Sequence, residues 1–110
     1  MSKKYKVELT SLAQEQIYEI AEYIIDNYQA PETADRFLGG LKLELSKLDT
    51  MPERAKLMEK EPWHSKGVHK YVVGNYIAYF LIDDSKNIVY VTAVVLDRRN
   101  QKKQLNEMNI

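Results

Sequence analysis

The hydrophobic residues of this chain change their spacing once, near the middle, and that change restricts the folds available to it. Before about residue 50, apolar residues recur every three or four positions, which is typical of amphipathic helices. After residue 67 they alternate or run together, with many β-branched residues, which is typical of strands. The sequence therefore predicts helices followed by strands, and this order favours an α+β fold.

Two helices are predicted in the first half. One begins near Thr10 or Ser11, either of which can cap a helix, and keeps its apolar spacing as far as Tyr28. Pro31 fits the first position of a second helix, whose period lasts to about Asp49. Because the link between them is short, the two helices are expected to form an antiparallel hairpin.

A pair of glycines lies inside the second predicted helix. Gly39 and Gly40 should each cost about 1 kcal/mol relative to alanine. Close packing against a neighbouring element would explain their presence, and a kink in the helix is the alternative.

Four strands are predicted, one before the helices and three after a loop at residues 53–67. Their ranges are Tyr5 to Thr10, Val68 to Val73, Tyr76 to Ile82 and Ile88 to Leu96. Gly74-Asn75 and the polar run Asp83 to Asn87 should close two hairpins, so the last three strands form an antiparallel meander. The last of them is nearly continuous in apolar character, so it is expected inside the sheet.

The expected architecture is a single α+β domain over residues 1–110. It consists of an N-terminal strand, a helical hairpin and a three-stranded antiparallel meander, with the helices packed on one face of an antiparallel sheet. A short helix is possible from about Asn100.

Cysteine and charge usage limit the classes of function. The chain has no cysteine, which excludes a disulfide framework, a zinc–thiolate centre and a cysteine nucleophile. Residues 1–61 carry 9 Lys and Arg against 12 Asp and Glu, whereas residues 62–110 carry 7 against 4. This split suggests a basic working surface on the C-terminal half, with ordinary surface patchiness as the alternative. No signal-peptide or membrane-spanning run is visible, so a cytoplasmic location is expected.

Five stretches of the sequence stand in a characteristic order. They are EIAEYI from Glu19, TADRF from Thr33, KLDTMPER from Lys47, GVHKYVVGNYIAYFLIDD from Gly67 and VLDRRNQKKQL from Val95. Together they resemble the RelE/ParE superfamily of bacterial type II toxins. The resemblance implies a growth-inhibiting toxin of a toxin–antitoxin module, associated with plasmid stabilisation and neutralised by a cognate antitoxin. RelE-like members cleave mRNA, mostly in the ribosomal A site, whereas ParE-like members poison DNA gyrase and are not known as nucleases.

The resemblance also assigns candidate roles to several cations. Arg98 matches, by its place at the end of the last strand, the arginine that contacts the scissile phosphate in RelE-like enzymes. Lys70 falls near the basic residues that those enzymes carry on the first meander strand. Both are candidate catalytic residues, and a surface ion pair is the alternative for Arg98. Further cations are candidate substrate ligands: Arg99, Lys66, Lys102 and Lys103.

His69 is the third candidate catalytic residue, because a histidine side chain can exchange a proton near neutral pH. A structural or solvated histidine is the alternative. Strand alternation places His69 and Tyr71 on one face and Lys70 on the other. His64 and His69 have no third ligand at a usable spacing, so neither a metal nor a cofactor is expected.

Two positions depart from the nuclease pattern. RelE-like nucleases carry a functional tyrosine after the arginine, where this chain has Gln104-Leu105, and a His-Tyr chain end is replaced by Asn109-Ile110. The sequence therefore leaves open whether the protein is an enzyme. The primary expectation is ribosome-dependent mRNA cleavage, with a ParE-like gyrase poison and an inert interaction domain as alternatives. In either active role, the apolar helix faces and open sheet edges are expected to bind the antitoxin.

Overall fold

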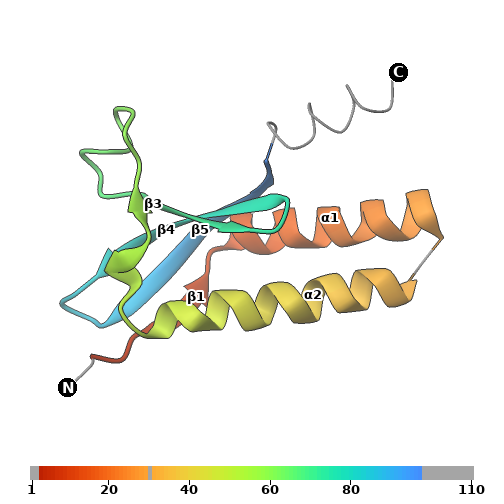
Figure 1. The fold of residues 1–110 in the computed structure, drawn as a ribbon, viewed down its shortest axis with the longest axis horizontal. Helices are drawn as coiled ribbons and strands as arrows, with labels where there is room; N and C mark the ends of the chain where they lie inside the picture. Colours follow the sequence, from red (N-terminus) through yellow and green to blue (C-terminus); the bar gives the residue numbers. More distant parts are fainter. Residues whose placement is uncertain (1–2, 30, 98–110) are drawn as a thin grey trace.

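The computed structural model describes residues 3–29 and 31–97 (Figure 1). Its elements are β1 (Lys6–Leu9), α1 (Ser11–Tyr28), α2 (Pro31–Ser46), the 3-10 helices η1 (Lys47–Asp49) and η2 (Pro52–Arg54), β2 (Lys56–Leu57), β3 (His69–Val73), β4 (Tyr76–Asp83) and β5 (Ile88–Leu96). The helices α1 and α2 form an antiparallel hairpin that packs on one face of the sheet, so the predicted α+β class is confirmed. Neither helix in these ranges is long and apolar enough to cross a bilayer.

The sheet has the strand order β1-β5-β4-β3-β2. The meander β3-β4-β5 is antiparallel as predicted, and β5 lies inside the sheet, but β1 pairs with β5 in parallel. The prediction of a wholly antiparallel sheet is therefore wrong at this pairing. The sequence also gave no indication of β2, which lies in the predicted loop and pairs with β3 through only two residues.

The N-cap and second turn of α1 are attached to β5 beyond the end of β1. Thr10 caps α1, because its Oγ1 accepts a hydrogen bond from the Ala13 N–H at 3.2 Å. The same hydroxyl donates to the Thr92 carbonyl at 3.2 Å. The side-chain oxygen of Gln16 accepts from the Val94 N–H at 2.9 Å. These bonds fix the helix over the sheet and occupy backbone groups of β5 that β1 is too short to reach.

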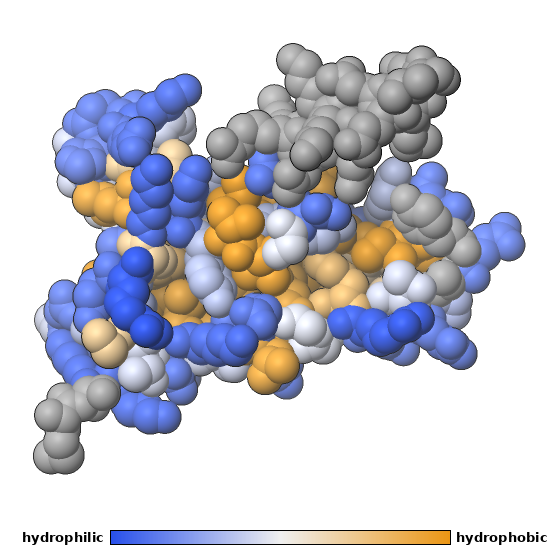
Figure 2. Space-filling view, viewed as in Figure 1, coloured by the Kyte–Doolittle hydropathy of each residue, from blue (hydrophilic) through white to orange (hydrophobic). Residues whose placement is uncertain are grey.

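The core lies between the helical hairpin and the sheet. Its centre is formed by side chains that are fully buried or nearly so: Ala13, Ala78, Phe80, Val89, Val91 and Val94. A second cluster of Ala21, Ile24 and Ala34 joins α1 to α2. In the space-filling view, hydrophobic side chains gather along the seam between helices and sheet, and hydrophilic ones surround them (Figure 2).

The two glycines of α2 do not pack against a neighbouring element. Gly39 and Gly40 are exposed, and no described atom lies within 4 Å of the position that a Cβ would take at either residue. The expectation of close packing is therefore wrong within the described chain.

Gly39→Ala and Gly40→Ala should each stabilise the protein by about 1 kcal/mol, because alanine restricts the unfolded chain and meets no obstruction in the helix. Urea denaturation of the two variants measures this change. Gly74→Ala serves as the control, since Gly74 has φ +57° and alanine should destabilise that turn. A loss of stability in either helical variant would contradict the open environment of the glycines.

Candidate functional site

The predicted site residues fall into two groups. One group lies outside the described residues and consists of Arg98, Arg99, Lys102 and Lys103. The others are His69 and Lys70 on β3 and Lys66 in the loop before it. Lys66 is exposed and lines neither of the two grooves described below.

His69 lies on the face of β3 that packs toward the core. Its ring stacks on Phe80, with ring centroids 5.2 Å apart and an interplanar angle of 11°. Its Nδ1 lies 2.9 Å from the Ala55 carbonyl oxygen. These contacts belong to a packing residue, which is the structural alternative that the sequence left open, and a role in proton transfer stays a prediction.

Lys70 lies on the opposite face of β3, as strand alternation predicted. The structure therefore does not bring Lys70 and His69 together. Instead, Lys70 is the direct cross-strand partner of Lys56 on β2. Two like charges in this position repel each other. Lys56 was not predicted as a site residue, because residues 53–67 show no hydrophobic period. Without such a period, neither a strand nor the direction of its side chains can be inferred.

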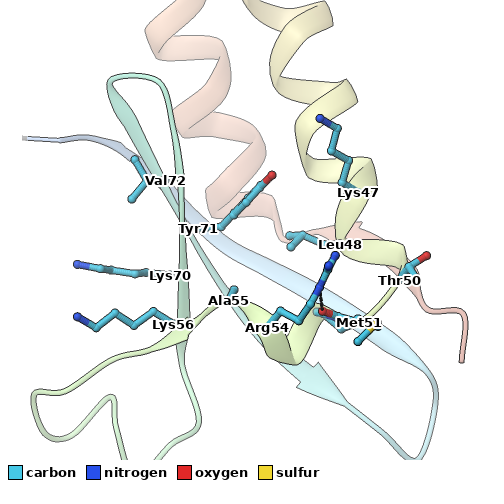
Figure 3. Close-up of a pocket in the computed structure, with 11 residues that line it drawn as sticks. Lys47, Leu48, Thr50, Met51, Arg54, Ala55, Lys56, Lys70, Tyr71 and Val72 are labelled. Carbon is cyan, nitrogen blue, oxygen red and sulfur yellow. Dashed lines mark hydrogen bonds between the residues drawn. The ribbon is translucent and has the colours of Figure 1, made fainter. Parts of the chain in front are cut away.

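A groove of about 380 Å³ lies at the β2–β3 edge of the sheet (Figure 3). We call it the basic groove, because four cations line it together with apolar side chains. The lining residues are Lys47, Leu48, Thr50, Met51, Pro52, Arg54, Ala55, Lys56, Lys70, Tyr71 and Val72. Three of the four cations come from residues 1–61, so the prediction that placed the basic surface on the C-terminal half misses most of this groove.

The four cations form two pairs on opposite sides of β3. Lys56 and Lys70 extend side by side away from the helices, and we call them the outer pair (Figure 3). Arg54 and Lys47 lie on the side of Tyr71 and the helices, and we call them the inner pair (Figure 3). The edge of β3 that faces β2 thus lies between the outer pair and the inner pair of cations.

A hydrogen-bonded network holds the inner side of the groove. Glu44 accepts a hydrogen bond from the Tyr71 hydroxyl at 3.0 Å and forms an ion pair with Lys47 at 2.9 Å. The Lys47 bond, followed by the Tyr71 bond, lowers the pKa of Glu44, and Glu44 in turn raises the pKa of Lys47. Burial, followed by the bond to Glu44, raises the pKa of Tyr71. Tyr71 is therefore a protonated donor that ties β3 to α2.

Two of the four cations already have a carboxylate partner. Lys47 pairs with Glu44, and Lys56 pairs with Glu59 at 3.1 Å. For Arg54 and Lys70, the described part of the chain provides no ion pair within 4 Å, although Arg54 donates a hydrogen bond from Nε to the Met51 carbonyl at 3.4 Å. The basic groove can therefore accept an anionic ligand.

The outer face of the sheet beside Lys70 is apolar and aromatic. Val72, Ile77 and Val95 form one cross-strand row, and Ile77 is only 8% exposed. The next row consists of Lys70, Tyr79 and Ala93. Neither row contains a carboxylate or a histidine. A metal-independent nuclease needs a general base and a general acid beside its phosphate ligand, and these two rows offer only the Tyr79 hydroxyl.

A second groove, of about 610 Å³, lies at the other edge of the sheet. We call it the apolar groove, since mostly aliphatic side chains of β1, α1 and α2 line it. The lining residues are Val7, Leu9, Gln14, Ile17, Tyr18, Leu38, Leu41, Lys42, Leu45 and Ser46. It runs beside β1, the edge strand, and so combines an apolar surface with an open strand edge.

The sequence identifies the family to which this fold belongs. Residues 7–101 match the family described as the ParE toxin of the type II toxin–antitoxin system parDE. The chain therefore belongs to the ParE toxin family and is a toxin of the RelE/ParE superfamily, as the resemblance predicted. A comparison with curated proteins gives no match.

Ten chains of solved structures match this fold, among them the following two. A chain of the chromosomal ParDE system from P. aeruginosa is 13% identical, with a TM-score of 0.71 over 86% of this chain and 98% of that one. A chain of the toxin–antitoxin complex RelBE2 from Mycobacterium tuberculosis is 19% identical, with a TM-score of 0.60 over 84% of this chain and 91% of that one. At these identities the two structures establish the fold.

The Glu44 network should make stability depend on pH. The folded-state pKa of Glu44 is below its ordinary value of 4.5, so its contribution is present above that value and is lost as pH falls through the lowered pKa. Urea midpoints measured between about pH 6 and about pH 3 should fall less steeply for Glu44→Gln than for the wild type. Glu22→Gln, on the exposed face of α1, should keep the wild-type slope. Equal slopes in all three proteins would contradict the assignment.

Proposed function

We propose that this toxin inhibits growth by acting on DNA gyrase in the cytoplasm, as a binding inhibitor that cleaves no nucleic acid. The observation that carries the proposal is the character of the outer sheet face. Lys70 shares its cross-strand row with Tyr79 and Ala93. The neighbouring row consists of Val72, Ile77 and Val95. A face of this kind suits contact with another protein better than proton transfer to and from a phosphate.

Two further observations support this proposal. His69, the histidine nearest to Lys70 in sequence, lies on the opposite face and is stacked on Phe80. The family match is to ParE toxins, and the sequence resemblance associates ParE-like members with gyrase. The proposal explains why Gln104-Leu105 stands where nucleases of the superfamily carry a tyrosine.

We further propose that a cognate antitoxin binds in the apolar groove. The two solved structures described above, which share this fold, come from toxin–antitoxin systems. The groove presents exposed Leu9 and Tyr18 and half-buried Leu38 next to the edge of β1. An amphipathic helix could bury its apolar face there, and an extended segment could pair with β1.

Ribosome-dependent mRNA cleavage is the second candidate function. It is favoured by the outer pair, because two lysines facing each other across strands become favourable when a phosphate lies between them. This function would need Arg98 and a general acid or base from elsewhere in the chain. It expects new 5′ ends within A-site codons, and it expects Lys70→Ala and Arg98→Ala to abolish them.

Purified toxin should increase gyrase-mediated double-strand cleavage of a supercoiled plasmid. The expected result is a rise in linear DNA after denaturant and protease treatment, because a toxin bound to gyrase delays religation. Toxin premixed with its antitoxin should restore the level seen with gyrase alone. If gyrase cleaves, religates and supercoils normally with toxin that arrests growth, the proposal fails.

A further inference from the structure

We propose that the basic groove is a second protein-binding site, which takes an extended acidic peptide segment that pairs with β3 as an added strand. This inference depends neither on gyrase nor on mRNA as the target. It concerns the β2–β3 edge of the sheet, whereas the proposed antitoxin groove lies at the β1 edge.

The first observation is an open strand edge. The Met58 N–H donates to the Val68 carbonyl at 2.8 Å, so the even-numbered residues of β3 direct their backbone groups toward β2. The ladder ends at the pair Lys56 and Lys70. The next even-numbered residue, Val72, therefore directs its N–H and C=O past the end of β2, where the basic groove lies. Exposed backbone groups of this kind are a template for an added strand.

The second observation is the apolar character of the groove beside that edge. Leu48 and Pro52 are already buried beneath the groove, and its exposed apolar lining residues are Met51 and Val72, at 44% and 49%. Apolar side chains on an incoming segment would bury further area against Met51 and Val72. This combination of strand edge and apolar lining favours a peptide over a nucleic acid, whose recognition relies on phosphates and base stacking.

The third observation is the placement of charge on both sides of the edge. Successive side chains of an added strand point to opposite faces. In one strand, a carboxylate at one position would face the outer pair, and a carboxylate at the next position would face the inner pair. Arg54 and Lys70, which have no ion pair within the described residues, would supply the strongest attraction. The preferred ligand is thus an extended segment with two adjacent Asp or Glu residues flanked by β-branched residues.

Fluorescence anisotropy with a labelled nine-residue peptide tests this site. The peptide carries a central Glu-Glu pair flanked by valine and threonine, and full-length toxin is titrated into it. Replacing Glu-Glu by Gln-Gln should weaken binding by about tenfold or more, because charged partners are lost. Methylating the peptide nitrogen that faces Val72 should weaken it comparably, because strand pairing needs that N–H.

The matched variants carry equal changes in charge. Arg54→Glu with Lys70→Glu should reduce peptide affinity by about tenfold or more. Lys60→Glu with Lys86→Glu removes two exposed lysines outside the groove. This double variant should leave peptide affinity within about twofold of the wild type, because salt screens charges at that distance. Circular dichroism and thermal unfolding verify that both double variants are folded.

Three outcomes would overturn the proposal. They are no peptide binding by folded toxin, an equal loss in the two double variants, and binding that survives methylation at every backbone nitrogen of the peptide. Tighter binding of a single-stranded oligonucleotide of the same net charge, with no measurable peptide binding, would assign the groove to nucleic acid instead.

Discussion

The attachment of α1 to β5 is the constraint on which the other features depend. β5 has nine residues and β1 has four, so the second half of β5 has no described strand beside it on the β1 side. Thr10 and Gln16 bond to the backbone of this segment, at Thr92 and Val94. The side chains of the N-cap Thr10 and of Gln16 in α1 thereby replace the missing strand and hold the helix across one face of the sheet. The hairpin then places α2 beside α1, and the Glu44–Tyr71 bond ties α2 to β3 at the far side.

Once one face is occupied by the helices, the two grooves at the sheet edges and the exposed part of the other face, such as Val72, remain for binding. The outer face carries apolar rows around Lys70 rather than acid–base groups. The apolar groove lies at the β1 edge, and the basic groove lies at the β2–β3 edge. Because these edges are at opposite ends of the strand order, a segment in one groove leaves the other open. One small sheet thus has room for a neutralising partner and a second ligand.

The sequence predicted the parts of this fold that depend on local chemistry. Thr10 capped the first helix and Pro31 began the second, as side-chain capping and proline geometry require. The direction of β1 relative to β5 was not predictable, because hydrophobic period gives the faces of a strand and not its neighbour. β2 was missed for a related reason, since two residues of irregular sequence pair with β3 only through tertiary contacts.

The candidate site was predicted less completely than the fold. Lys70 was identified, but Arg54 and Lys56 lie in an irregular segment that gives no facing direction, and Lys47 lies near the end of a predicted helix whose neighbour on the sheet the sequence does not reveal. The stacking of His69 on Phe80 was not predictable either, because the two residues are neighbours only through the register between β3 and β4. Arg98 and the cations after it lie outside the described residues, so their roles remain predictions.

The order in which macromolecular synthesis stops after toxin induction tests the central claim most directly. Pulse labelling with thymidine and methionine in the same culture, sampled within the first minutes, gives that order. A toxin that acts on gyrase should stop DNA synthesis first, while protein synthesis continues at its initial rate. Protein synthesis that stops first, with thymidine incorporation still intact, would contradict the account and assign the toxin to the ribosome.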